Sequence, residues 1–152
     1  MNRAIVRQAT LDDLKILLEY EQGVIEAERP FDITIKKTPV TYYDIKTMII
    51  ADDVEVIVME YDGQIVSCGY ALIKSARLYL NHEKYAYLGF MYTHPDYRGK
   101  GLNARVVDVL KEWSLSKGLK EIRLTVYNDN IPAIKAYEKV GFEKHIIEMR
   151  LK

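Results

Sequence analysis

The sequence contains a single cysteine, Cys68, and its acidic and basic residues balance, with 22 of each. One cysteine excludes a disulfide within the chain, and its place in a strand-like segment indicates a buried, reduced thiol in a cytoplasmic protein. A net charge of zero means that the chain lacks the overall positive charge of a dedicated nucleic-acid-binding domain. We therefore expect no nucleic-acid partner, and any site for an anion must be local.

Long apolar segments are also absent. No uninterrupted hydrophobic run approaches the roughly 20 residues of a membrane-spanning helix, and the first eight residues alternate between polar and apolar without a signal-peptide core. We therefore predict a cytoplasmic protein with no membrane partner. The chain does contain 49% hydrophobic and 29% charged residues, a globular composition. Its length is typical of one domain, so residues 1–152 are predicted to form a single domain.

Hydrophobic periodicity predicts an α/β fold in which helices flank a mixed central sheet. The predicted strands comprise residues 4–8, 54–61, 64–74, 85–93, 121–127 and 143–151, and the predicted helices comprise residues 10–27, 41–51, 103–117 and 131–140. Asp62-Gly63 favours a tight antiparallel hairpin between the second and third strands. Residues 28–39, which carry two prolines and no clean period, are predicted to form a mobile loop that faces the substrate.

A glycine-rich segment, Pro95-Asp-Tyr-Arg-Gly-Lys-Gly-Leu-Asn-Ala104, joins a predicted strand end to a helix start. Gly99 and Gly101 have no Cβ, so the chain can wrap closely around an anion with several N–H groups turned inward. The helix start adds its partial positive charge at the same place. The segment is not a nucleotide-triphosphate P-loop, because Lys100 is followed by glycine. Taken alone, it fits an anion site and a plain strand-to-helix turn equally well.

The second informative segment runs from Asn130 to Phe142. Asn130 is predicted to cap a helix, and Asn130, Ala133 and Tyr137 fall on one face of that helix. The small Ala133 leaves room between the two polar groups, so a slender ligand could lie along this face. The alternative is that Asn130 only caps and Tyr137 only packs.

Together the two segments resemble the GNAT superfamily of N-acetyltransferases. The superfamily's CoA motif, Gln/Arg-x-x-Gly-x-Gly/Ala, corresponds here to Arg98-x-x-Gly101-x-Asn103, and its later helix motif corresponds to Asn130-x-x-Ala133-x-x-x-Tyr137-x-x-x-Gly141-Phe142. The order of strands and helices agrees over nearly the whole chain. Asn103 departs from the motif, which has a small residue there. Backbone donors survive that change, so acetyl-CoA remains the expected ligand, with a different acyl-CoA as the alternative.

The resemblance implies that acetyl-CoA is the co-substrate. Backbone N–H groups of the glycine-rich loop would hold its pyrophosphate, and the edge of the preceding strand would pair with its pantetheine arm. The residues assigned to the cofactor in this way are Met91, Tyr92, Thr93, Arg98, Gly99, Lys100, Gly101, Leu102, Asn103, Ala104 and Asn130. The acetyl group would then lie where two parallel strands, 85–93 and 121–127, splay apart at the CoA site.

The resemblance also implies direct acetyl transfer to a primary amine of a small molecule, peptide or protein that the sequence does not identify. Tyr137 matches the superfamily's tyrosine and would act as the catalytic acid toward the departing thiolate. A backbone N–H near Met91 or Tyr92 would bind the oxyanion.

The sequence does not identify the general base. Members of the superfamily often take it from the strand before the loop, but residues 87–92 include no acid. The carboxylates that could act instead through water, and that could equally be ordinary solvated charges, are Glu26, Glu28, Asp32 and Glu55.

Three further expectations concern the remaining polar and aromatic residues. His82, His94 and His145 have no ligand-like spacing with one another or with Cys68, so no metal site is predicted. The tyrosines that could line an acceptor cleft are Tyr42, Tyr43, Tyr79 and Tyr92. The alternative to an enzyme is a non-catalytic CoA-binding or protein-interaction module with the same fold, and the assembly is either a monomer or a homodimer.

Overall fold

The structure is a computed structural model that describes residues 3–152. Five strands form one sheet in the order β1-β2-β3-β4-β5. They are β1 (Ala4–Gln8), β2 (Val54–Tyr61), β3 (Gln64–Ser75), β4 (Lys84–Thr93) and β5 (Ile122–Leu124). The first four pair antiparallel, and β5 pairs parallel with β4. The predicted mixed sheet is confirmed.

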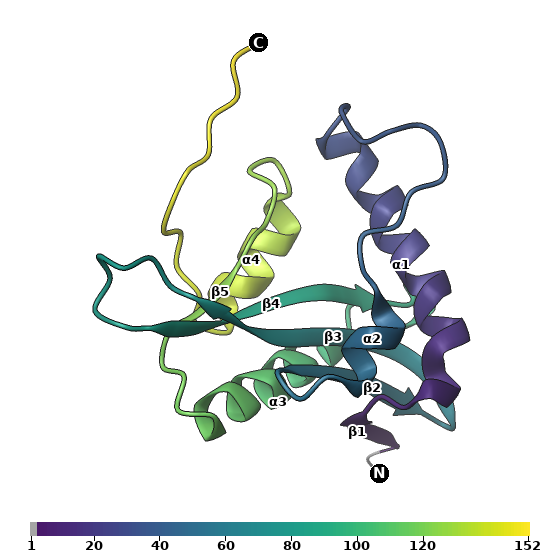
Figure 1. Cartoon of the computed structure of the whole chain (residues 1–152). Coiled ribbons are helices and arrows are strands. Elements are labelled where there is room, and N and C mark those ends of the chain that lie inside the picture. Colours follow the sequence, from purple (N-terminus) through teal and green to yellow (C-terminus); the bar gives the residue numbers. More distant parts are fainter. Residues whose placement is uncertain (1–2) are drawn as a thin grey trace.

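Four helices surround this sheet (Figure 1). They are α1 (Leu14–Glu28), α2 (Ile45–Ile50), α3 (Leu102–Ser116) and α4 (Ile131–Lys139). Figure 1 shows α3 on one face of the sheet, α1 and α2 on the other, and α4 standing beside β5. The parallel β5 requires a crossover connection from β4, and α3 supplies it.

The central strands are apolar on both faces because helices cover both faces. Successive residues of β2 point to opposite sides, so Ile57 and Met59 join the core beneath α3, whereas Val56 and Val58 join the core beneath α1 and α2. Cys68 lies in the second of these cores as a buried free thiol, as the sequence predicted.

The hairpin prediction is confirmed. Asp62 and Gly63 have φ angles of 53° and 80°, and Tyr61 faces Gln64 across the turn. Two consecutive residues with positive φ match the twist of the flanking strands, which is why the Asp-Gly pair predicts this turn.

The predicted last strand, residues 143–151, is wrong. Residues 143–152 have no regular secondary structure and are exposed throughout. Their alternating pattern is typical of a strand, but a strand also needs a neighbour to complete its hydrogen bonds. Within residues 3–152, no backbone hydrogen bond joins this segment to the sheet.

Two other predicted elements are several residues shorter in the structure. The strand predicted at 121–127 is only Ile122–Leu124, because the chain diverges from β4 after Leu124. The helix predicted at 41–51 begins at Ile45, after Asp44 accepts a hydrogen bond from the Thr47 N–H as its N-cap. The residues between α1 and α2 connect the two helices on the same side of the sheet.

Candidate active site

The candidate site begins where β4 and β5 part. Their ladder joins only Ala86–Leu88 to Ile122–Leu124, although β4 continues to Thr93. The last part of β4 therefore has a free edge on the side toward β5, and the predicted splaying of the two strands is confirmed.

A bulge in β4 lies at this opening. Opposite the single residue Gly69 of β3 stand two residues of β4, Phe90 and Met91, and the register shifts there. Phe90 is buried and has a φ of 55°, a conformation that bulky residues rarely adopt. Bulges often re-aim the backbone next to active sites, and this one redirects β4 at the point where it parts from β5.

The alternation of β4 shows which backbone groups face the free edge. The Tyr92 carbonyl accepts from Ser67 Oγ at 2.9 Å and the His94 N–H donates to the Val66 carbonyl at 2.8 Å, so Tyr92 and His94 face β3. Neighbouring residues point the opposite way. The backbone groups of Met91 and Thr93 therefore face the free edge. The side chain of Tyr92 packs against α1, where the centre of its ring lies 4.7 Å from that of Tyr20.

The glycine-rich loop follows β4 directly. After a short 3₁₀ turn, Pro95–Tyr97, Gly99 and Gly101 adopt φ angles of 77° and 73°, and Gly101 is the residue before α3. The first N–H groups of α3 have no partner within the helix, and the helix dipole places partial positive charge on them. A Cβ on either glycine would meet no atom within 4 Å, so the requirement for glycine comes from the backbone angle.

The two cations of this loop are held against tyrosine rings. Arg98 donates from Nε to the Thr93 carbonyl at 2.8 Å, and its guanidinium lies 5.5 Å from the centre of the Tyr92 ring. The Lys100 ammonium lies 5.3 Å from the centre of the Tyr97 ring. Positive charge is therefore local to the loop, in a chain whose net charge is zero.

Helix α4 carries Tyr137 to the other side of the opening. Asn130 caps this helix by accepting a hydrogen bond from the Ala133 N–H at 3.3 Å. Tyr137 is half-buried and packs edge-on against Phe142 at 6.0 Å. Burial, then the negative charge of Glu28 and the proximity of Tyr87, raise the Tyr137 pKa to about 12. The phenol is therefore protonated at neutral pH and can donate a proton.

Glu28, the last residue of α1, is the carboxylate that lies near Tyr137. Burial raises its pKa, and burial followed by the proximity of Glu28 raises the pKa of the Tyr42 phenol. The charge of Glu28 also contributes to the raised pKa values of Tyr43 and Tyr127. The charge of one half-buried carboxylate therefore helps to raise the pKa of several phenols.

The other carboxylates named as alternative bases are engaged elsewhere. Glu26 pairs with Arg29 at 2.8 Å and its side chain is 68% exposed. Asp32 pairs with Arg150 at 3.1 Å, and this ion pair holds the pKa of Asp32 well below its usual range. Glu55 lies on β2, near Gln8. Of these four carboxylates, only Glu28 contributes to the raised pKa of Tyr137.

Three of the four tyrosines expected at an acceptor cleft, Tyr42, Tyr43 and Tyr92, lie near the β4 bulge. The Tyr43 ring is 5.0 Å from that of Phe90 and 5.7 Å from that of Tyr42. Tyr79 lies on the connection between β3 and β4, 78% exposed, and does not join this cluster.

Glu21 is a residue that sequence reasoning missed. It lies on α1, its side chain is fully buried, and one carboxylate oxygen accepts from the backbone N–H groups of Tyr42 and Tyr43 at 2.8 and 2.7 Å. These hydrogen bonds fix the backbone at Tyr42 and Tyr43, where the connection between α1 and α2 approaches the start of α2. The available signal was a charged residue on the apolar face of α1, between Leu17 and Val24.

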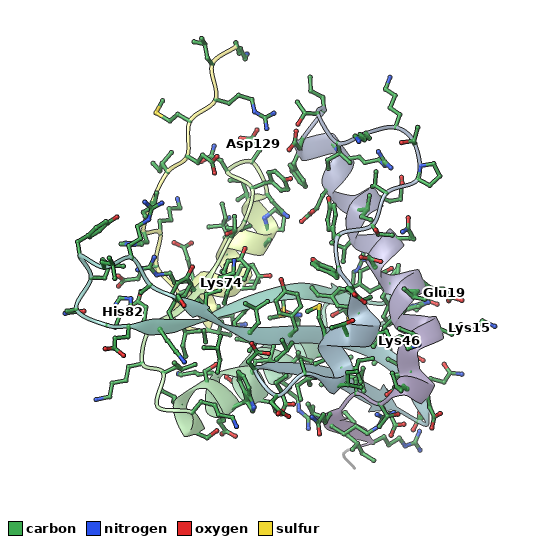
Figure 2. All side chains as sticks on the ribbon, viewed as in Figure 1. Lys15, Glu19, Lys46, Lys74, His82 and Asp129 are labelled. Carbon is green, nitrogen blue, oxygen red and sulfur yellow. The ribbon has the colours of Figure 1, made fainter. Side chains whose placement is uncertain are left out.

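The histidines come from three segments of the chain: His82 precedes β4, His94 follows β4, and His145 lies after α4. Figure 2 places His82 on the connection between β3 and β4, away from Asp129, which lies in the loop before α4. Among the residues that the structure describes, no group of three or more histidine, cysteine, aspartate or glutamate side chains could hold a metal ion. Across residues 3–152, no helix is long and apolar enough to cross a membrane.

Comparison with known proteins identifies the family. The model of the Acetyltransferase (GNAT) family matches residues 22–142, and the chain belongs to this family. An uncharacterized N-acetyltransferase of Methanocaldococcus jannaschii, MJ1207, is 27% identical over 143 residues, which cover 91% of this chain and 60% of that protein. The chain spans less than two thirds of the length of the curated relatives it matches.

Solved structures agree with this fold. A mutant BH1408 protein of Bacillus halodurans superposes with a TM-score of 0.86 and 18% identity, covering 97% of this chain and 98% of that chain. A predicted acetyltransferase of Clostridium acetobutylicum, solved with acetyl-CoA, gives a TM-score of 0.72 and 19% identity, covering 98% of this chain and 96% of that chain. At these identities the likeness establishes the fold.

Proposed function

We propose that the protein is an N-acetyltransferase that moves the acetyl group of acetyl-CoA directly to a primary amine. The observation that carries this proposal is a coincidence of three features at one opening in the sheet. A free strand edge at Met91 leads to a glycine loop at the start of α3, and a protonated phenol, Tyr137, lies on the other side. Membership of the GNAT family supports the same reaction.

In this proposal acetyl-CoA binds along β4 and the loop. The backbone N–H groups of residues 98–104 would hold the pyrophosphate, with Arg98 and Lys100 adding local positive charge. The backbone groups of Met91 and the N–H of Thr93 would pair with the amides of the pantetheine arm, since the Thr93 carbonyl already accepts from Arg98. Tyr92 would contribute its ring and Asn130 its amide. Localisation in the cytoplasm remains a prediction from the sequence.

The chemistry requires three events. The neutral amine attacks the thioester carbonyl, so that a C–N bond forms as the C–S bond breaks. A backbone N–H at the β4 bulge would stabilise the oxyanion. The departing sulfur takes a proton from Tyr137, whose phenol is still protonated at neutral pH. The proton that the attacking nitrogen loses as the amide forms would restore the Tyr137 phenol, so the transfer balances.

Glu28 would remove the proton from the amine. A primary ammonium has a pKa near 10.4, so most acceptors arrive charged at neutral pH. Glu28 is half-buried, and its charge contributes, after burial, to the raised pKa of Tyr137. A carboxylate in that position can attract the ammonium and accept its proton through a water molecule.

Acetyl transfer to a panel of amines tests the proposed function. Purified protein is mixed with acetyl-CoA and with amino acids, polyamines, amino sugars or peptides, and both released thiol and acetylated amine are measured. We expect at least one amine to be acetylated in step with thiol release. If acetyl-CoA binds but no amine in a broad panel is acetylated, the protein is a non-catalytic CoA-binding module and the proposal is wrong.

Replacing Glu28 with glutamine should lower kcat/KM about 10²-fold at neutral pH while leaving acetyl-CoA affinity unchanged. Burial raises the pKa of Glu28, so wild-type activity should increase as pH rises through that raised value, when the carboxylate becomes charged. The Glu28→Gln variant should not show this increase of activity with rising pH.

Glu26→Gln is the matched control for this experiment. Glu26 stands two residues away on the same helix, but its side chain is exposed and paired with Arg29. It should leave both the rate and the pH profile unchanged. A Glu28→Gln profile that keeps the wild-type shape would remove Glu28 from the role of base and leave the other parts of the proposal standing.

A further inference from the structure

The outer part of the candidate site combines two stacked aromatic rings with a largely buried carboxylate. The Phe31 ring, just after α1, stacks on the Tyr127 ring, between β5 and α4, with 5.9 Å between the ring centres and 17° between the ring planes. This contact joins the end of α1 to the segment before α4, which rises on the same side of the sheet (Figure 1). Asp32 follows Phe31, and its side chain is only 14% exposed. Its carboxylate therefore lies at the edge of a stacked aromatic pair.

The carboxylate of Asp32 already holds a positive charge. The Arg150 guanidinium, which reaches Asp32 from the segment after α4, lies 3.1 Å from Oδ1 and 3.4 Å from Oδ2. The side chain of Arg150 is 62% exposed, and ion pairs of exposed side chains contribute little to stability. A cation that belongs to a bound substrate could therefore replace Arg150 with little loss of stability.

Asp32 can accept more hydrogen bonds than the chain supplies. Its Oδ1 accepts from the backbone N–H and the hydroxyl of Thr34 as well as from Arg150. Within the described residues, Oδ2 has two contacts, from Tyr127 and Arg150, both at the long distance of 3.4 Å. A carboxylate oxygen has two lone-pair positions for close hydrogen bonds. Oδ2 is therefore able to bind an ammonium group.

Asp32 lies one helical turn beyond Glu28, the base in the proposed function. The Asp32 N–H donates to the Glu28 carbonyl at 3.2 Å. Glu28 contributes to the raised pKa values of both Tyr137 and Tyr127, whereas Asp32 contributes to that of Tyr127. Four residues of helical chain correspond to a rise of about 6–8 Å. An acceptor whose amine reacts beside Glu28 and Tyr137 could therefore place a second charged group at Asp32.

We propose that Asp32 and the stacked rings of Phe31 and Tyr127 bind a second positive charge of the acceptor, so that the favoured substrates are diamines and other doubly charged amines. This inference rests on the proposed acetyltransferase function and specifies the acceptor for the same site. Arg150 occupies the position of the second charge when no substrate is bound. Aromatic faces and a carboxylate both attract an ammonium group, whereas both repel a carboxylate of the substrate.

Three amines of similar length test this proposal with the full chain and acetyl-CoA. Cadaverine carries a second ammonium, pentylamine lacks it, and aminohexanoate carries a carboxylate in its place. We expect kcat/KM for cadaverine to exceed that for pentylamine about tenfold, and aminohexanoate to be the poorest of the three. The preference for cadaverine should weaken as the salt concentration rises. A preference no larger than the pair of equivalent amines in cadaverine would give by itself overturns the proposal.

Substitutions test whether Asp32 causes the preference. Asp32→Asn keeps the shape of the side chain but removes its charge, so it should abolish most of the preference for cadaverine over pentylamine. Arg150→Gln removes the competing cation and should increase the preference about twofold to fivefold. Glu26→Gln, which removes an exposed carboxylate from α1, is the control and should keep the wild-type preference. Thermal unfolding shows whether each variant is folded. Wild-type preference in Asp32→Asn, or no increase in Arg150→Gln, would contradict the proposal.

The same assays separate this inference from the proposed function. If cadaverine and pentylamine are acetylated equally well, the protein is an acetyltransferase and the site for a second charge is wrong. The conclusion is the same if none of the three amines reacts but another amine of the broad panel does. If no amine of the panel is acetylated, the proposed function fails, and this inference fails with it.

Discussion

Replacing Tyr137 with phenylalanine should slow acetyl transfer by about 10²–10⁴-fold while leaving the acetyl-CoA dissociation constant within a few-fold of wild type. The ring would still pack against Phe142, so the fold and the cofactor site keep their shape. The missing group is the hydroxyl, which burial and Glu28 keep protonated with a pKa of about 12. Without it, the departing thiolate has no nearby acid.

Single-turnover acetyl transfer across pH is the measurement for this variant, because slow product release could hide a slower chemical step. Tyr87→Phe provides a control, since Tyr87 lies near Tyr137 but its hydroxyl donates to Thr125 Oγ1 at 2.7 Å. This second variant should retain most of the rate. An unchanged rate in Tyr137→Phe at every pH would mean that another group, or water, is the acid.

Replacing Gly101 with valine should weaken acetyl-CoA binding by about 10- to 100-fold. Gly101 has a φ of 73° at the start of α3, and a β-branched residue strongly resists that conformation. The loop would have to rearrange, and its N–H groups would no longer converge on one anion.

Gly118→Val separates this effect from general strain. Gly118 follows α3 with a φ of 78°, and a Cβ added to it, as at Gly101, would meet no atom within 4 Å. Both variants should therefore lose similar stability, but only Gly101→Val should lose affinity in a calorimetric titration. Equal acetyl-CoA affinity in the two folded variants would remove Gly101 from the site.

Local sequence signals predicted much of this molecule. The Asp62-Gly63 pair predicted the hairpin because its two positive φ angles suit few other residues. The glycine loop and the capping role of Asn130 were also readable, since each depends on residues next to one another in the chain. Helical spacing in α3 predicted its extent to within a residue at each end.

Features that depend on distant neighbours were not predictable. The bulge at Phe90 arises from pairing with β3, and nothing in the strand's own residues marks it. The sequence offered four carboxylates as possible bases, and Glu28 stood out from the other three only when the fold brought the end of α1 near Tyr137 on α4. The alternating pattern of residues 143–151 predicts a strand, but no sequence pattern tells whether a strand's partner lies in the same chain.

Calorimetric titration of the wild-type protein with acetyl-CoA tests the central claim most directly. We predict one site per chain, and a rise in thermal stability that corresponds to about 2.7 kcal/mol when free ligand is 100 times the dissociation constant. The physical reason is that the loop at residues 98–104 and the free edge of β4 have donors that acetyl-CoA can satisfy. The absence of both binding heat and thermal stabilisation at saturating acetyl-CoA would contradict the account.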